Sequence, residues 1–232
     1  MKEIVKFIKE GLKITSNTKV NGRPKYNYHP KTKKELQDLL KQLVEERGNE
    51  GDFNDINTSK ITDMTDLFDG INKFNGNISK WDVSNVKDMM CMFYGCKLFN
   101  QNISNWDVSS VTDMNAMFYG CESFNQNISN WNVSNIINME SMFGNCKLFN
   151  QDISNWNVSK VTNMAYMFVN CNLFNQPLAN WDVSNVKDMM YMFNNCKSFN
   201  QDISNWDVSN VKYSNGMFEK CIIKEKYQPN FN

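Results

Sequence analysis

The sequence predicts an α/β solenoid: a stack of 25-residue strand–helix coils that forms one parallel sheet, with an N-terminal helical cap. Three observations predict it. All six tryptophans of the 232-residue chain follow one another at intervals of 25 residues. Within each interval an alternating apolar pattern precedes a helical one, and these two periods distinguish a strand from a helix. A capping box and a run of leucines stand ahead of the first complete copy.

The repeat keeps several residue types in step. Valine lies two, phenylalanine twelve and cysteine fifteen residues after each tryptophan, and a degenerate first copy occupies about residues 50–75. A lone copy cannot bury its apolar residues, so the copies must stack and share one core. The tryptophans are therefore assigned to the structural core: Trp81, Trp106, Trp131, Trp156, Trp181 and Trp206.

Each copy divides into two predicted elements. Residues 78–83 have the L-x-x-L-x-L form of a leucine-rich-repeat strand. The apolar residues at 86, 89, 93 and 96 step by three and four, which predicts one face of a short helix. Gly95, and Asn145 at the same position two copies later, suit a positive φ after that helix. The asparagine that follows the next phenylalanine, such as Asn100, predicts a side-chain ladder that satisfies turn amides between coils.

These residues resemble the 25-residue class of the BspA-family leucine-rich repeat surface proteins of bacteria. The motif of that class is M-x-x-M-F-x-x-C-x-x-F-N-Q-x-I-x-x-W-x-V-S-x-V, and the chain matches it throughout residues 89–111. The resemblance covers about residues 50–221. It implies a leucine-rich-repeat-like fold and a surface or adhesion-like repeat protein, lipid-anchored or secreted, with no enzymatic activity.

The flanks predict three regions: a basic N-terminal arm and capping helix over 1–48, the repeat solenoid over 49–221, and a short C-terminal tail over 222–232. Thr32 and Glu35 form a capping box, and leucines follow at helical spacing, which predicts an amphipathic helix over 32–47 that covers the first coil. A second helix is predicted over 3–13. Asn21-Gly22 is a turn signal between the two.

The charge is balanced in total and uneven along the chain. Lys and Arg number 25, as do Asp and Glu, but residues 1–34 carry a net charge of +8 and residues 35–232 a net charge of −8. Such a dipolar chain favours either a solvated basic extension or electrostatic docking of the arm on an anionic partner, including another copy. The overall balance argues against a protein that coats nucleic acid.

An exposed polar strip is the candidate binding surface. The residue between each tryptophan and valine, and the residue before each tryptophan, alternate away from the core. Two interpretations are open: the strip binds a peptide, a glycan or cations, or its Asp and Asn side chains form local turns with the following serine and their mixture relieves like-charge repulsion between neighbouring strands. The strip consists of Lys80, Asp82, Asn105, Asp107, Asn130, Asn132, Asn155, Asn157, Asn180, Asp182, Asn205 and Asp207.

Catalytic, cofactor and metal sites are not expected. His29 is the single histidine, which excludes chemistry that needs two imidazoles. No nucleophile elbow, phosphate-binding loop or dinucleotide fingerprint interrupts the repeat. The cysteine register permits either disulfides between coils or a ladder of buried free thiols, and the missing export signal favours thiols.

Three functions follow from these patterns. The first is a non-enzymatic interaction or adhesion-like scaffold that presents its polar face to an unidentified protein, or to a glycan. The second is an assembly component that forms homo-oligomers through the basic arm and the acidic body. The third is an anionic-polymer binder that uses residues 1–34. Lys6, Lys9 and Glu10 interrupt any export signal, so we expect a cytoplasmic protein without membrane insertion; the family resemblance makes the cell surface the alternative.

Overall fold

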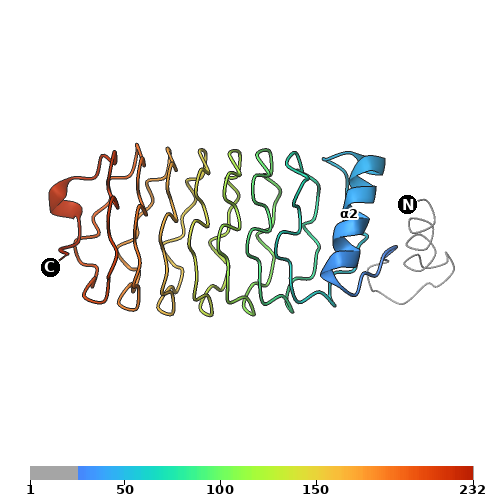
Figure 1. The fold of residues 1–232 in the computed structure, drawn as a ribbon, viewed down its shortest axis with the longest axis horizontal. Coiled ribbons are helices and arrows are strands. Elements are labelled where there is room, and N and C mark those ends of the chain that lie inside the picture. The colour runs from blue at the N-terminus through green and yellow to red at the C-terminus, as the bar shows by residue number, and fades with distance from the viewer. Residues whose placement is uncertain (1–25, 232) are drawn as a thin grey trace.

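The computed structural model describes residues 26–231, and they form one elongated stack of coils (Figure 1). Helix α2, Lys33–Arg47, lies at one end and the 3-10 helix η1, Glu225–Tyr227, at the other. The repeats follow in chain order between them. The predicted helix over 3–13 and the turn at Asn21-Gly22 lie outside the described residues.

The prediction of strand–helix coils on one parallel sheet is wrong. Within residues 26–231 the helices are α2 and η1, both outside the tryptophan copies, and the β-pairing consists of isolated parallel bridges. One register bridges each neighbouring pair of coils, from Asp63 with Asp88 to Asp188 with Tyr213. Single bridges make a line along the stack and no sheet. The α/β solenoid is therefore corrected to a stack of coils built from turns.

A left-handed residue replaces the predicted helix. Helical amides would all bond within their own segment, but at Cys91 the backbone has φ 54° and the run breaks. The Cys91 N–H donates to the Asn115 carbonyl of the next coil (2.8 Å), whereas the Met92 N–H donates to the Met89 carbonyl three residues back (3.2 Å). Alternate backbone N–H groups thus donate to carbonyls of the neighbouring coil. The non-glycine residues with φ of 50–58° at this position are Asp66, Cys91, Ala116, Ser141, Tyr166 and Tyr191.

The predicted strand is a turn for a similar reason. The Trp81 N–H donates to the Ile78 carbonyl in its own coil (3.1 Å) and so is not available to a neighbouring strand. The indole supplies the bond between coils: Nε1 of Trp106 donates to the same Ile78 carbonyl (3.3 Å). All six indoles donate in this way to a carbonyl 28 residues earlier, at 3.0–3.3 Å. Each tryptophan is buried and is also a hydrogen-bond donor.

The predicted asparagine ladder is confirmed. Oδ1 of Asn100 accepts from the backbone N–H of Asn125 in the next coil (3.0 Å), and Nε2 of Gln126 donates to the same oxygen (3.0 Å). The backbone bond recurs along the stack and ends at Lys224, whose N–H donates to Asn200 Oδ1 (3.0 Å). A partly buried turn cannot rely on water, so the side chain of one coil satisfies the amide of the next.

Two columns of phenylalanine fill the interior. The rings of Phe93 and Phe118, equivalent residues of neighbouring coils, stack with centroids 5.5 Å apart, and those of Phe99 and Phe124 at 6.0 Å. Within one coil Phe93 and Phe99 are 3.9 Å apart. Offset aromatic pairs contribute about 0.5–1.5 kcal/mol each beyond the burial of their surface. The core is therefore continuous along the stack.

Helix α2 confirms the predicted amphipathic helix and covers the first coil. Thr32 is its N-cap and accepts from the Glu35 N–H (3.2 Å), while the Glu35 carboxylate accepts from the Lys31 N–H (2.7 Å). Leu36 and Leu43 are fully buried in the same cluster as the repeat core. The helix thus protects apolar surface that the first coil would otherwise expose.

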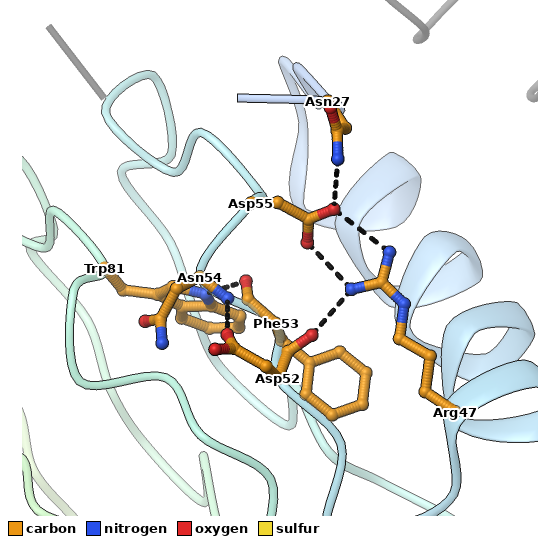
Figure 2. Close-up of polar contacts among 7 residues, drawn as sticks. All are labelled: Asn27, Arg47, Asp52, Phe53, Asn54, Asp55 and Trp81. Carbon is orange, nitrogen blue, oxygen red and sulfur yellow. Dashed lines mark hydrogen bonds and ion pairs between the residues drawn. The ribbon is translucent and has the colours of Figure 1, made fainter. Parts of the chain in front are cut away.

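An ion pair connects the C-terminal end of α2 to the first coil (Figure 2). Arg47 makes two hydrogen bonds to the Asp55 carboxylate (2.8 and 3.0 Å) and one to the Asp52 carbonyl (2.6 Å). Asn27 donates to Asp55 as well (2.7 Å). Burial raises the pKa of Asp55, but the bonds from Arg47 and Asn27 outweigh it and hold that pKa below its usual value.

The segment after the last copy packs back on the stack. The Ile203 N–H donates to the Tyr227 carbonyl (2.9 Å), and Ile223 is buried. Residues of α2, of the repeats and of this segment belong to one hydrophobic cluster. The division into 1–48, 49–221 and 222–232 stays a prediction.

Truncation of a central tryptophan tests the shared core. Trp131→Ala should lower the free energy of unfolding by about 3–5 kcal/mol, because it opens a cavity inside the stack. Trp131→Phe should cost less, since it keeps most of the apolar volume and loses the bond to Ile103. Urea unfolding followed by circular dichroism measures both. A loss below about 1 kcal/mol for Trp131→Ala would contradict a buried role.

Removal of one ladder side chain tests the contact between coils. Asn125→Ala leaves the Asn150 N–H and the Gln151 amide without their acceptor, so it should cost about 1–3 kcal/mol. Asn130→Ala is the matched control: Asn130 is exposed, and its loss should change stability by less than about 0.5 kcal/mol. Equal urea midpoints for the two variants would refute the ladder.

Candidate functional site

The structure leaves the whole predicted polar strip exposed. All twelve residues, from Lys80 to Asp207, are exposed, and equivalent members recur once in every coil. They flank tryptophans that are only 3–5% exposed. Turns place these side chains on the surface, and not the strand that the sequence predicted. The strip therefore follows the long axis of the stack.

The strip residue that follows each tryptophan is an acceptor in a local turn, which confirms the structural role considered for it. Asp82 Oδ1 accepts from the backbone N–H of Ser84 (3.1 Å) and from its hydroxyl (2.6 Å). Asn157 accepts in the same way from Ser159, at 3.1 and 2.7 Å. Each Asx-turn fixes its side chain in one orientation. The role of the strip in binding stays a prediction.

The same turns lower the pKa of three carboxylates of the strip. Hydrogen bonds from the serine two residues further along hold the pKa of Asp107, Asp182 and Asp207 below the usual value for aspartate. For Asp182, the neighbouring Asp207 opposes this effect. The strip thus presents lasting negative charge near both ends, and the neutral amides of Asn132 and Asn157 between. Acceptors and fixed charge suit the recognition of a partner.

The cysteine register forms a ladder of free thiols. All seven cysteines are free, and those from Cys96 to Cys196 are buried. The thiol of Cys146 donates to the Phe118 carbonyl (3.0 Å), and the pattern recurs in neighbouring coils. Burial raises the pKa of Cys96 to about 12 and that of Cys146 well above the ordinary thiol value. Within residues 26–231 no cluster of three or more His, Cys, Asp or Glu is placed to hold a metal ion.

A groove lined by tyrosines lies elsewhere on the surface, and the repeat pattern did not predict it. Most of its residues are half-buried and stand at positions whose residue type differs from copy to copy, whereas a repeated position is what predicts a role in the fold. The sequence does contain a signal for the groove. Tyrosine stands thirteen residues after the tryptophan in two copies, at Tyr94 and Tyr119, and ten residues after it in two later copies, at Tyr166 and Tyr191. This tyrosine groove is lined by Tyr94, Ala116, Tyr119, Glu140, Ser141, Tyr166, Val169 and Asn170.

The fold and the strip define a repeat protein whose 25-residue coils share one core. The chain belongs to the family described as "Mycoplasma protein of unknown function, DUF285", whose model matches residues 36–152 and again 126–230. Two overlapping matches agree with internal repetition. No curated protein and no solved structure matches the chain. In the described part of the chain, no helix is both long and apolar enough to cross a membrane.

Thiol labelling tests the buried cysteine ladder. At pH 8 a thiol-specific reagent should label at most the half-buried Cys91 and Cys221 in the native protein, and all seven cysteines in concentrated urea. Unfolded thiols ionise near the ordinary value of 9.0, whereas the buried ones ionise higher. The unfolded state therefore releases protons first, and the free energy of unfolding should fall as the pH rises above about 9. Rapid labelling of more than two native thiols would contradict the ladder.

Proposed function

We propose that the chain is a non-enzymatic interaction scaffold that presents its polar strip to a protein partner. The observation that carries the proposal is that different positions of each copy form the core and the exposed strip. The tryptophan, methionine, phenylalanine and cysteine registers build the interior, while the strip remains exposed in every coil. A surface repeated along one axis suits an extended partner that makes many similar contacts.

The geometry of the strip supports recognition by repeated weak contacts. The Asx-turns use Oδ1 of Asp82, Asp107 and equivalent residues, and these residues are exposed. Preorganised side chains lose little conformational entropy on binding. Several contacts along one rigid axis then add through effective concentration. The resemblance to BspA-family proteins supports an adhesion-like role at a cell surface, with a glycan as the alternative partner.

Site-specific photo-crosslinking tests this function. A benzophenone side chain is introduced at Asn130 or Asn155, exposed strip positions whose replacement leaves the Asx-turns intact, and the purified chain is irradiated in an extract of its native cells. The matched control carries the same group at Leu148, which is 48% exposed in another register. We expect one protein adduct from both strip positions and none from Leu148.

The alternatives give different products in the same experiment. An adduct of two copies of this chain would contradict the proposal and support assembly through the basic arm and the acidic body. Equal adducts from the strip and from Leu148, or no adduct, would also contradict it. An adduct that a glycosidase removes would assign a glycan partner in place of the protein.

A further inference from the structure

The tyrosine groove arises where tyrosine changes from one position of the repeat to another, in two columns of mostly half-buried side chains. The relevant positions lie ten and thirteen residues after each tryptophan. The coils of Trp81 and Trp106 have tyrosine thirteen residues after the tryptophan, and the coils of Trp156 and Trp181 have it ten residues after. The coil of Trp131, which lies between them, has tyrosine at neither position. The first column is Cys91, Ala116, Ser141, Tyr166 and Tyr191, and the second is Tyr94, Tyr119, Gly144, Val169 and Asn194.

The tyrosines form two stacked pairs on either side of that coil. The rings of Tyr94 and Tyr119 are 5.1 Å apart and nearly parallel, and those of Tyr166 and Tyr191 are 5.2 Å apart. Each stacked pair holds its own rings in place. Tyr119 and Tyr166, the inner members, both line the groove, with the coil of residues 137–145 between them.

Small residues keep the groove open. Ser141 and Ala116 line it where other coils have tyrosine. A Cβ atom on Gly144 would lie 2.6 Å from the ring of Tyr119, so only glycine lets that ring lie over the backbone here. The groove is thus a built interruption of a regular surface, and it is bounded by aromatic rings.

The charge around the groove is negative. The three turn segments 112–120, 137–145 and 162–170 contain Asp113 and Glu140 and no lysine or arginine. Glu140 lines the groove, and its Oε2 accepts from the amide of Asn163 (2.9 Å), which holds the carboxylate in place. The corresponding flanking segments carry a lysine, Lys87 or Lys187. An anionic ligand would therefore meet repulsion at the centre.

Aromatic faces beside a fixed carboxylate complement a cation. A guanidinium or ammonium group stacks over a tyrosine ring and pairs with a carboxylate at the same time. We propose that the tyrosine groove binds an arginine- or lysine-bearing segment of a partner polypeptide, with the cationic group between Tyr119 and Tyr166 and paired with Glu140. This site does not depend on the polar strip, and it is distinct from the function proposed above.

Fluorescence anisotropy with defined probes tests the proposal on the full chain. The probes are a labelled glycine–arginine dodecapeptide, its citrulline counterpart of the same shape without charge, and a labelled neutral oligosaccharide. We expect the arginine peptide to bind at least about tenfold more tightly than the citrulline peptide, because cation–π and ion-pair contacts need the charge. The oligosaccharide should bind more weakly than the arginine peptide.

Variants separate the groove from general attraction to an acidic protein. Tyr166→Leu leaves the charge unchanged, and Glu140→Gln removes the carboxylate; each should weaken binding of the arginine peptide about tenfold. Their matched controls, Tyr213→Leu and Glu50→Gln, alter exposed residues outside the groove and should leave the affinity unchanged.

One variant fills the groove with little risk to the fold. Ser141→Tyr places a tyrosine where Tyr166 and Tyr191 already occupy the same register with φ of 58° and 53°, so the backbone at Ser141, φ 57°, accepts it. It should keep the thermal midpoint and abolish peptide binding. Equal binding of the arginine and citrulline peptides, unchanged affinity in Tyr166→Leu or Ser141→Tyr, or tighter binding of the oligosaccharide would each overturn the proposal.

Discussion

Backbone amides inside a stack of coils need acceptors, and the chain meets this need by sending alternate amides in opposite directions. The Met89, Cys91 and Phe93 N–H groups donate to carbonyls of the next coil. Of the amides between them, the Met92 N–H donates to the carbonyl three residues back and the Met90 N–H donates to the Asp88 carboxylate. The left-handed residue at Cys91 makes this alternation possible. It costs roughly 1–2 kcal/mol in a non-glycine residue, and the bond it permits between coils offsets that cost. A helix at this place would satisfy its own amides and would remove these backbone bonds between the coils.

Side-chain ladders complete the contacts that the backbone leaves open. The indole of Trp106 reaches the Ile78 carbonyl, the asparagine at 100 serves the amide of Asn125, and thiols such as that of Cys146 donate to buried carbonyls. Because these residues face inward or between coils, the exposed positions are free to vary without loss of the fold. Binding surfaces are therefore expected at two kinds of place: where a polar residue recurs in every coil, and where the surface pattern changes.

The period, the buried registers and the asparagine ladder were predictable, because burial and unsatisfied amides impose the same residue type at every copy. Helix α2 was predictable from the capping box at Thr32. The positive φ at Gly95 and Asn145 was also expected, although a helix was expected before it. The strand and the helix were not: apolar steps of three and four fit a succession of turns as well as a helix. In the first five tryptophan copies the left-handed position holds Cys91, Ala116, Ser141 or a tyrosine, and none of these residues signals a positive φ; Gly216, in the last copy, does. The polar strip was found because it repeats, and the tyrosine groove was missed because it does not.

Scalar couplings across hydrogen bonds, measured by nuclear magnetic resonance on the deuterated chain, test the alternation of amides most directly. The account predicts couplings from the Cys91 nitrogen to the Asn115 carbonyl carbon, from Ala116 to Glu140, and from Ser141 to Ala165. Couplings from these three nitrogens to carbonyls four residues earlier would reveal helices in place of bonds between coils, and would contradict the account.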